Sequence, residues 1–507
     1  MSSCFIDIRN LTFSYDRSPD PVFESVSLRL HRGWTGVVGP NGCGKTTLLK
    51  LITGLLIPES GMIYTPGISS YCEQRTDHIP AQFTAMAGSR SGKVQRLINV
   101  LGIHGDWRFR WSTLSHGERK RCQIAVALYP EPSVLAIDEP TNHLDMQMKV
   151  AVREALESFT GVGLLVSHDR YLLDKLCTHT MFIDTPAVDL RRGGYSDARD
   201  EREREKAYLI NQRQNLKKQV KRLKKELGDR KRRAQASDRR RSKKKIAPKD
   251  RDSKSRIDLA RLSGKDAVDG KRYKLLKNRI KRLGYHCDSI RKIVTQQMGI
   301  AFDESAERGL KTLIIPSGSI SLGGSKHLIY PDLSIQERDR IGILGGNGTG
   351  KSTFVRHIVR NFNLPGKHIV YIPQEIPEDE SQCLTEHIHR LNGSELGGMM
   401  TVISRLGSDP ERLLDSTIPS PGEVRKLMLA EGIRRKPYVI IMDEPTNHMD
   451  LPSIECLEQA LKACSCPLVL VSHDQVFLTN LATHYWSFGK IADSEYSVVE
   501  SPSPSSG

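Results

Sequence analysis

Short apolar runs, bounded by polar or turn-forming residues, recur in both halves of the chain. The clearest are residues 4–8, 34–38, 133–137, 162–166, 438–442 and 468–471. Runs of this length, alternating with amphipathic stretches such as residues 47–52, are typical of buried strands between helices. Each half is therefore predicted to be an α/β domain with a largely parallel sheet.

A different period governs the middle of the chain. Residues 196–241 contain almost no glycine or proline, and apolar residues recur there, and again after residue 276, at steps of three, four or seven. The two series are Leu209, Leu216, Val220, Leu223 and Leu227, then Leu276, Ile280, Leu283, Cys287, Ile290 and Val294. They predict two helices forming an antiparallel hairpin, about 65 Å long from the helical rise, with a turn after Pro248 stops the first helix.

Three motifs in the first half recur in the second at offsets of 306, 305 and 305 residues. The pairs are Gly39–Thr46 with Gly345–Ser352, Asp138–Asp145 with Asp443–Asp450, and Ser167–Asp169 with Ser472–Asp474. Independent motifs that keep one offset indicate the duplication of a whole domain.

The first repeated motif has the chemistry of a phosphate loop. Both copies fit G-x-x-x-x-G-K-[ST], and the first lies between a predicted strand and a predicted helix. Glycines let backbone N–H groups surround phosphate, the lysine reaches the β- and γ-phosphates, and the hydroxyl binds Mg²⁺. The repetition argues against an ordinary structural turn.

The composition is that of a soluble multidomain protein. The chain has 507 residues, of which 38% are hydrophobic, and no apolar run of about 18 residues that would predict a membrane span. Its first residues lack the pattern of a secretory signal. Ten scattered cysteines predict reduced thiols and a cytoplasmic protein, and Cys464 with Cys466 has no second pair to complete a metal site.

The positive charge is concentrated in one segment. The net charge is +17, yet residues 191–290 hold 36 Lys and Arg against 14 Asp and Glu, which leaves 40 against 45 elsewhere. A basic helical segment between two mildly acidic bodies predicts binding to nucleic-acid phosphates, weakened by salt. Only Tyr273 and Tyr285 are interleaved, so base stacking is not expected to dominate. A solvated face or disordered linker is the alternative, which the apolar series argue against.

The order of motifs resembles the ATP-binding cassette ATPases. A phosphate loop is followed by a glutamine (Gln74, Gln374), by Ser-x-Gly-Glu (from Ser115 and Ser420), by Asp-Glu and by Ser-His-Asp. Two cassettes without a membrane domain, both with Glu-Pro-Thr-Asn-His-[Leu/Met]-Asp, resemble the ABC-F branch. The resemblance implies two tandem P-loop NTPase domains joined by the long antiparallel α-helical hairpin.

The resemblance also implies roles for individual residues. Glu139 and Glu444 would polarise the attacking water, and His168 and His473 would touch the γ-phosphate. Mg²⁺ would be held, partly through water, by Thr46, Gln74, Asp138, Ser352, Gln374 and Asp443. ATP would be bound by Tyr15, Gly39, Pro40, Asn41, Gly42, Cys43, Gly44, Lys45, Thr46, Thr47, Gln74, Ser115, Gly117, Glu118, Asp138, Gly345, Gly346, Asn347, Gly348, Thr349, Gly350, Lys351, Ser352, Thr353, Gln374, Ser420, Gly422, Glu423 and Asp443.

In this family the cassettes pair head to tail within one chain, so the protein is expected to be a monomer. Ser420 and Gly422 would then close site one, which has the phosphate loop Gly39–Thr46. Ser115 and Gly117 would close site two, which has the loop Gly345–Ser352. The usual Leu-Ser-Gly-Gly is altered in both copies, and Pro421 removes one N–H donor at site one.

Two spacings add detail to the expected sites. Tyr15 is placed to stack on adenine at site one, but the equivalent position near Ser321 has no aromatic residue, so site two is expected to hold nucleotide more loosely or without base selectivity. Between Gln74 and Ser115 there is room for a small helical lobe and, at most, a very short additional arm.

The connector of ABC-F proteins enters the ribosome at the tRNA exit site, where its tip approaches the P-site tRNA and the peptidyl-transferase centre of the large-subunit rRNA. The resemblance places there Arg239, Arg240, Arg241, Lys243, Lys244, Lys245, Lys249 and Arg251. A long connector without an arm is most similar to the antibiotic-resistance members, which protect ribosomes. A cytoplasmic ribosome-binding ATPase that uses ATP and Mg²⁺ is the resulting expectation.

The expected organisation is a first cassette at 1–190, a basic helical linker at 191–305, a second cassette at 306–492 and a disordered Ser/Pro-rich tail at 493–507. A general translation factor is the main alternative function. The ATPase of a membrane transporter would have no use for a basic hairpin, and a DNA-associated ATPase would be stimulated more by duplex DNA than by ribosomes. Complete catalytic motifs in both copies argue against a non-enzymatic scaffold.

Overall fold

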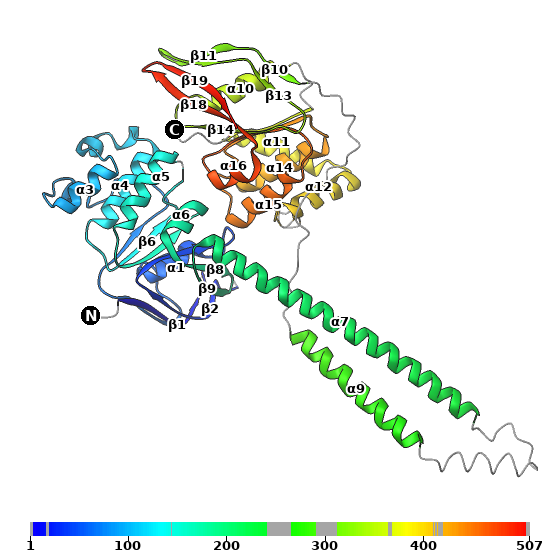
Figure 1. The fold of residues 1–507 in the computed structure, drawn as a ribbon. Helices are drawn as coiled ribbons and strands as arrows, with labels where there is room; N and C mark the ends of the chain where they lie inside the picture. The colour runs from blue at the N-terminus through cyan, green and yellow to red at the C-terminus, as the bar shows by residue number, and fades with distance from the viewer. Residues whose placement is uncertain are drawn as a thin grey trace, which may run out of the picture. The chain divides into compact units, whose positions relative to one another are not determined.

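The computed structural model describes residues 4–16, 20–142, 144–240, 265–289, 312–362, 368–408, 410, 413 and 419–502. The contacts of the chain divide it into two units, Met1–Ala198 with Gln296–Gly507, and Arg199–Thr295. The first unit holds two α/β domains (Figure 1), here called domain 1 (described residues up to 198) and domain 2 (described residues from 312). The second unit is the helical insert, here called the hairpin.

Domain 1 contains a six-stranded sheet in the order β5-β6-β7-β3-β8-β9, parallel except for β9. A separate antiparallel sheet has the order β2-β1-β4. The elements are β1 (Phe5–Phe13), β2 (Phe23–His31), β3 (Gly33–Val38), α1 (Lys45–Ile52), β4 (Ser60–Tyr64), β5 (Ser69–Cys72), α2 (Phe83–Ala87), α3 (Gly92–Val100), α4 (His116–Leu128), β6 (Val134–Asp138), α5 (Met146–Glu157), β7 (Val162–Val166), α6 (Arg170–Leu176), β8 (Cys177–Asp184) and β9 (Ala187–Arg192).

Domain 2 repeats this plan. Its eight-stranded sheet has the order β11-β12-β19-β18-β14-β17-β16-β15, in which the five strands from β18 to β15 are parallel. The elements are β10 (Leu313–Ile315), β11 (Gly318–Gly323), β12 (Lys326–Tyr330), β13 (Leu333–Ile335), β14 (Arg340–Gly345), α10 (Lys351–Asn361), β15 (Ile369–Ile372), α11 (Glu378–His389), α12 (Gly393–Arg405), α14 (Pro421–Arg434), β16 (Val439–Asp443), α15 (Leu451–Lys462), β17 (Leu468–Val471), α16 (Gln475–Leu481), β18 (His484–Ala492) and β19 (Glu495–Ser501).

The central strands are apolar throughout because both faces of each sheet are covered. Side chains of a strand alternate between faces. Along β6, Leu135 and Ile137 belong to one core cluster of domain 1, and Val134 and Ala136 belong to the other. The same division holds for β16 of domain 2. The six strands predicted from apolar runs are therefore confirmed, each within one or two residues of its expected position, although β1 continues to Phe13.

The prediction of a disordered tail from residue 493 is wrong for Glu495–Ser501, which form β19. This strand pairs antiparallel with β18 and parallel with β12. Tyr496 and Val498 alternate inward and are buried, at 9% and 3% exposure. The alternation of apolar and polar residues predicts this strand better than the Ser/Pro composition does, because that composition is confined to the residues from 501 onward. Residues 503–507 lie outside the described part of the chain.

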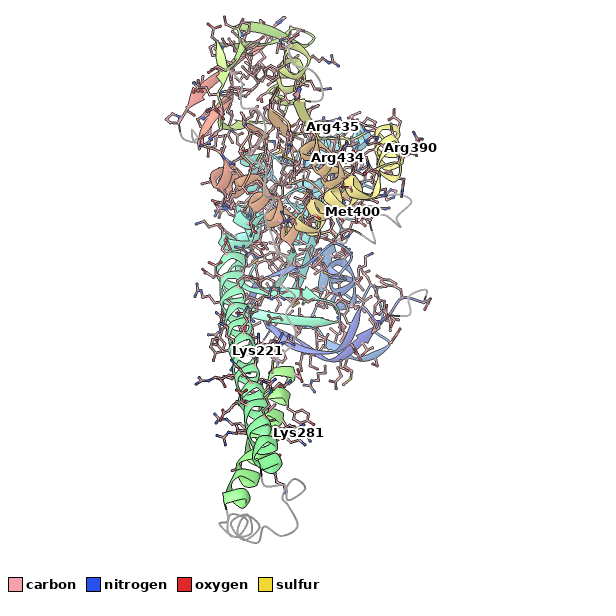
Figure 2. The ribbon with its side chains drawn as sticks, turned by 90° about the vertical axis from the view of Figure 1, so that its right-hand side faces the viewer. Lys221, Lys281, Arg390, Met400, Arg434 and Arg435 are labelled. Atoms are coloured by element: carbon pink, nitrogen blue, oxygen red, sulfur yellow. The ribbon has the colours of Figure 1, made fainter. Side chains whose placement is uncertain are left out.

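The hairpin consists of α7 (Tyr195–Arg240), whose first turn belongs to the domain 1 unit, and α9 (Lys265–Ser289). The two helices run side by side in opposite directions in both views (Figures 1 and 2). Leu216 on α7 and Cys287 on α9 are buried, and the other described members of both apolar series are half-buried. The predicted antiparallel hairpin is confirmed over this length; Ile290 and Val294 lie outside the described residues.

Residues 75–114 form the small helical lobe of domain 1. They contain the short helices α2 and α3 and two 3-10 turns. Phe83, Met86 and Trp107 anchor this lobe in the domain 1 core. The spacing between Gln74 and Ser115 is used up by this lobe, in agreement with the expectation of no long arm.

Candidate functional site

Each phosphate loop connects a central strand to a helix start, β3 to α1 in domain 1 and β14 to α10 in domain 2. Gly44 and Gly350, the N-caps of these helices, have φ of 95° and 93°, in the left-handed region that favours glycine. A Cβ on Gly44 would lie 2.5 Å from Val22, and one on Gly350 would lie 2.6 Å from Leu322. Both loops therefore require glycine where the backbone turns into the helix.

The loop lysines are held by their own loops. The Lys45 ammonium donates to the carbonyls of Gly39 and Pro40 at 2.9 and 3.0 Å. Lys351 donates to the carbonyls of Gly345 and Gly346 at 2.8 and 2.9 Å. Each positive charge is thus kept at the position where the phosphate oxygens of a nucleotide would bind.

The Asp-Glu pairs lie at the carboxyl ends of β6 and β16, where open α/β sheets bind ligands. The Thr46 hydroxyl donates to Oδ2 of Asp138 at 2.6 Å, which joins the loop to the strand end. Glu139 and Glu444 both have φ of 49°, a strained backbone for a residue with a side chain. The same strain in both copies aims each glutamate at the end of its sheet.

The two glutamates are buried next to the loop of the Ser-His-Asp motif. Oε2 of Glu139 accepts from the backbone N–H of His168 at 3.3 Å, and Oε2 of Glu444 accepts from that of His473 at 3.3 Å. Burial raises the pKa of Glu139 to about 8, and the neighbouring Asp138 carboxylate adds to the effect. Burial likewise raises the pKa of Glu444 to about 7. Both carboxyls therefore ionise near neutral pH, as suits a general base.

The two histidines are neutral in these surroundings. Burial lowers the pKa of His168 and of His473 to about 3, with Lys45 and Lys351 adding to the effect. Nε2 of His168 lies 3.2 Å from Oε1 of Glu139 but without hydrogen-bond alignment. Nε2 of His473 lies 3.1 Å from Oδ1 of Asn347 and 3.4 Å from the Lys351 ammonium. His473 thus faces its own phosphate loop.

The Ser-x-Gly-Glu motifs begin α4 and α14. Ser115 and Ser420 are N-caps with complete capping boxes. Glu118 and Glu423 return their carboxylates to the serine backbone N–H, at 2.8 Å in both copies. These two glutamates, expected to bind ATP, instead fix the starts of their helices in this structure, because a helix N-terminus leaves N–H groups and a partial positive charge to satisfy.

Site two combines residues of both domains around a cavity of about 710 Å³, a size typical of ligand pockets. Its lining includes, from domain 1, Ser115, Gly117, Lys149 and His168, and from domain 2, Asn347, Gly348, Gly350, Lys351, Ser352, Thr353, Gln374, Asp443, Glu444 and His473. The head-to-tail pairing predicted for site two therefore has its geometric counterpart. Leu322 also lines the cavity, in the region where the sequence offered no aromatic residue.

Site one is joined across the domains by a different contact. The backbone N–H of Asn41 donates to Oδ2 of Asp450 at 2.7 Å, and its side chain donates to the His448 carbonyl at 3.4 Å. That carbonyl would lie 3.1 Å from a Cβ on Gly422. The loop before α15 therefore links the first phosphate loop to the motif expected to close it. Leu451 continues this contact, since it belongs to the core cluster of domain 1.

Tyr15 lies at the edge of site one. Its hydroxyl shares a hydrogen bond with Thr47 at 2.9 Å, and its ring contacts Phe13 edge-on at 5.0 Å between centroids. The side chain is 46% exposed, so its ring is accessible for stacking on a base. Gln74, expected at the same site, is also exposed at the surface.

Two buried cations were missed by the sequence reasoning. Lys120 donates to the carbonyls of Glu73 and Asp138 at 2.6 and 2.8 Å. At the equivalent position, Arg425 donates to the Asn447 carbonyl at 2.6 Å and to that of Gln374. Lys120 thus links α4 to the loop that contains Gln74, and Arg425 links α14 to the loop that contains Gln374. The two cations occupy equivalent positions in the repeat, 305 residues apart, and this equivalence was the sequence signal that could have revealed them.

The donor set suits ATP with Mg²⁺. A hard divalent cation takes oxygen ligands. Each site offers a hydroxyl and a carboxylate, and site two adds the amide of Gln374, which lines its cavity. Oε1 of Glu139, Oε1 of Glu444 and Oδ1 of Asp443 are buried without a hydrogen-bond partner among the described residues. Buried polar atoms are otherwise nearly always paired. Asp443 and Glu444 line the cavity of site two, where their unpaired oxygens are available to a metal and an attacking water.

Comparisons with known proteins agree with this geometry. The sequence profile of the family described as ABC transporter matches residues 23–142 and 330–447. The chain is 27% identical over 490 residues to the "Ribosome protection protein VmlR" of Bacillus subtilis, covering 92% of this chain and 83% of that protein. It is 26% identical over 485 residues to the "ATP-binding protein Uup" of Buchnera aphidicola, covering 89% and 75%.

A solved structure shares the fold. It is the archaeal ribosome recycling factor aABCE1 in complex with the ribosomal stalk protein aP1, with a TM-score of 0.62, 17% identity, and coverage of 96% of this chain and 89% of that one. Within the described residues, no helix is both long and apolar enough to cross a membrane.

Two phosphate-loop domains that contribute to each other's nucleotide sites define a twin-cassette P-loop ATPase, which hydrolyses ATP to ADP and phosphate. The chain carries two ATP-binding cassettes on either side of a helical insert. Relatives such as VmlR and Uup are ABC-F proteins, so these similarities agree with the resemblance that the order of motifs had indicated.

Proposed function

We propose that this protein is a cytoplasmic ribosome-bound ATPase that protects translating ribosomes from antibiotics. The supporting observation is the combination of two composite nucleotide sites with a basic helical hairpin inserted between the domains. A relative named as a ribosome protection protein, aligned over 92% of this chain, supports the same assignment.

The described hairpin has the charge expected of an RNA-binding element. Residues 213–232 and 274–289 contain 15 Lys and Arg against 3 Asp and Glu, and most of these basic side chains are exposed. Lys221 and Lys281 lie on the surfaces of the two helices (Figure 2). Basic groups on this scale bind phosphate by releasing counterions, with an affinity that falls steeply with salt.

The hairpin would enter the ribosomal tRNA exit site, with its end near the P-site tRNA and the peptidyl-transferase centre of the large-subunit rRNA. Arg239 and Arg240 end α7, and no side-chain position is described for them. The other residues expected at the tip, Arg241, Lys243, Lys244, Lys245, Lys249 and Arg251, lie outside the described residues. Their contacts therefore stay predictions.

Each cassette would supply the chemistry of ATP hydrolysis in the same way. The loop N–H groups and Lys45 or Lys351 bind the phosphates, and the buried glutamate orients water for in-line attack on the γ-phosphorus. Oε1 of Glu139 or Glu444 accepts the proton of that water as the bond to the bridging oxygen breaks. Mg²⁺, held by Thr46 and Asp138 or by their counterparts, would neutralise charge on the phosphate oxygens.

The ATP cycle would control residence on the ribosome. With ATP in both sites, nucleotide joins the phosphate loop of one domain to the Ser-x-Gly motif of the other, so the domains stay paired. Hydrolysis removes the γ-phosphate that both domains contact, which weakens the pairing and releases the protein. A single chain completes both sites, so a monomer suffices.

The test uses a double variant, Glu139→Gln with Glu444→Gln, which should bind ATP but stay on ribosomes. Co-sedimentation with 70S ribosomes at low salt should show it retained, whereas wild type and the surface control Glu24→Gln are released as ATP is consumed. Release of the double variant at the wild-type rate, with unchanged ATP affinity, would reject the scheme.

A second measurement addresses the biological role. Cells expressing the protein should tolerate higher concentrations of drugs that bind near the peptidyl-transferase centre, and the double variant should give no protection. Unchanged susceptibility, together with ATP-dependent ribosome binding, would instead identify a general translation factor.

A further inference from the structure

We propose that Lys149 and Arg170 of domain 1 are positioning residues for His473, the γ-phosphate histidine of site two, and that site one lacks the equivalent device. The inference rests on the role proposed for His473. It makes the two ATP sites unequal in a way that the repeated motifs do not show.

Lys149 holds the backbone of His473 from the opposite domain. Its ammonium, on α5, donates to the His473 carbonyl at 3.1 Å and pairs with Asp169 at 2.8 Å. Burial alone would lower the pKa of Lys149, but Asp169 and then Asp474 raise it, so the ammonium stays charged. Lys149 and His473 both line the cavity of site two.

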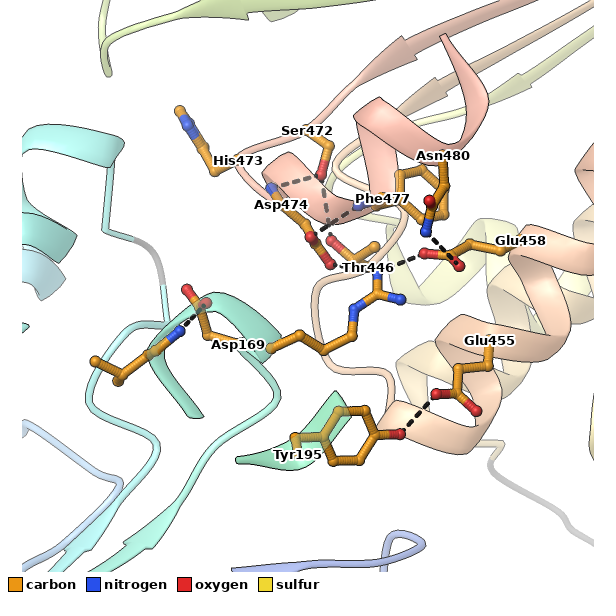
Figure 3. Close-up of polar contacts among 12 residues, drawn as sticks. Asp169, Tyr195, Thr446, Glu455, Glu458, Ser472, His473, Asp474, Phe477 and Asn480 are labelled. Carbon is orange, nitrogen blue, oxygen red and sulfur yellow. Dashed lines mark hydrogen bonds and ion pairs between the residues drawn. The ribbon is translucent and has the colours of Figure 1, made fainter. Parts of the chain in front are cut away.

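Arg170 holds the next residue of the same turn. Arg170 is the first residue of α6, and its guanidinium pairs with Oδ2 of Asp474 at 3.2 Å and with Oε1 of Glu458. Figure 3 shows its two partners, Asp474 at the start of α16 and Glu458 on α15. Arg170 and Glu458 are only 6% and 8% exposed, so water screens the pair little. Asn480 donates to the second oxygen of Glu458 at 3.2 Å and fixes its orientation.

The two contacts flank the histidine. Domain 1 binds the carbonyl of His473 and the carboxylate of Asp474, and Asp474 also caps α16 through the N–H of Phe477 at 2.9 Å. With both sides of its Cα held, the imidazole stays within reach of Lys351 and Asn347. Charge-assisted hydrogen bonds are the strong kind, so they restrict this turn more than neutral bonds would.

The repeat shows that these charged contacts run from domain 1 to the histidine turn of domain 2, without equivalents from domain 2 to domain 1. At the offset of 305 residues, Lys149 corresponds to Ile454 and Arg170 corresponds to Gln475. Isoleucine has no polar group, and glutamine carries no charge. Ile454 and Gln475 of domain 2 therefore cannot form charged contacts with the Ser167–Asp169 turn of site one. Asp169 pairs with Lys149 of its own domain instead.

The consequence is that hydrolysis at site two should depend on this contact between the domains, whereas hydrolysis at site one should not. The contact aligns a group that acts on the γ-phosphate but does not touch the rest of the nucleotide. Its loss should therefore lower kcat and leave KM for ATP nearly unchanged.

The test reads each site separately. Glu139→Gln leaves site two as the active site, and Glu444→Gln leaves site one. Into both backgrounds go Lys149→Ile and Arg170→Gln, the residues that the other half of the repeat carries at these positions. We expect Arg170→Gln to lower kcat about tenfold in the site-two background, the effect of losing a charge-assisted contact, and less than about twofold in the site-one background. Lys149→Ile also removes the pair with Asp169 next to His168, so it should lower kcat in both backgrounds.

Two controls distinguish positioning from general damage. Lys149→Arg with Arg170→Lys keeps both charges and should restore most of the rate. With His473→Ala already present, Lys149→Ile and Arg170→Gln should cause no further loss, because residues that act through one group are not additive.

An equal loss from Arg170→Gln in both backgrounds, a loss confined to KM, no loss at all, or additivity with His473→Ala would each overturn the proposal. Retained turnover at site one shows that the variant is folded. Failure of the ribosome-release experiment would leave these ATPase measurements unaffected, so the two proposals fail separately.

Discussion

The raised pKa values of the two buried glutamates predict that hydrolysis increases with pH, by different amounts at the two sites. The carboxylate, not the carboxylic acid, accepts a proton from water. Because burial favours the neutral acid, the pKa lies at about 8 for Glu139 and about 7 for Glu444. Each glutamate becomes active only as the pH passes its own pKa.

The magnitude follows from the ionised fractions. Between pH 6.5 and 8.5, a group of pKa about 8 goes from roughly 3% to roughly 76% ionised, a factor of about 25. A group of pKa about 7 goes from roughly 24% to roughly 97%, a factor of about 4. His168 and His473, with pKa values of about 3, stay neutral over this pH range and therefore add no second step to the pH profile.

The assay is phosphate release at subsaturating ATP, since kcat/KM reports the ionisation of the free enzyme. Glu444→Gln leaves site one and should show the steep rise, and Glu139→Gln leaves site two and should show the shallow one. Saturating Mg²⁺ is kept throughout, and the ionisation of ATP cancels in the ratio of the two profiles. Flat profiles, profiles falling with pH, or the opposite order of steepness would refute the reasoning.

Three further predictions concern single side chains. Gly44→Ala should weaken ATP binding at site one at least tenfold, measured with a fluorescent ATP analogue, because its φ of 95° and the contact with Val22 leave no room for Cβ; unchanged affinity would contradict this. Tyr15→Ala in the Glu444→Gln background should raise KM for ATP, whereas Tyr15→Phe, which keeps the ring, should not; an unchanged KM in Tyr15→Ala would argue against stacking. Gly284→Ala, whose Cβ would enter open space in α9, should stabilise that helix by about 1 kcal/mol, seen as slower amide hydrogen exchange; faster exchange would show that the glycine is needed there.

Several features of the site were predictable because their signals are local. A phosphate loop needs glycines at fixed places, a lysine and a hydroxyl, and all of these lie within eight residues. Apolar strands such as β6 are read from composition alone, since both faces are buried. The duplication of each motif then excluded chance.

Other features depended on contacts between residues far apart in sequence. β19 was missed because it is short and adjoins the Ser/Pro-rich end of the chain, and because pairing with β18 and β12 stabilises it. Asp450 belongs to a repeated motif, but only the folded chain shows that it binds the backbone of Asn41, 409 residues away.

The sequence by itself determined that two nucleotide-binding domains flank a basic helical hairpin, because motifs and periodicities depend only on residues that are close together in the sequence. Only the tertiary structure decided which contacts between the domains distinguish the two sites. Lys149 and Arg170 lie outside every repeated motif, and their partners are about 300 residues away in the other half of the chain. A buried ion pair between domains is specified by three-dimensional proximity, which no local pattern records.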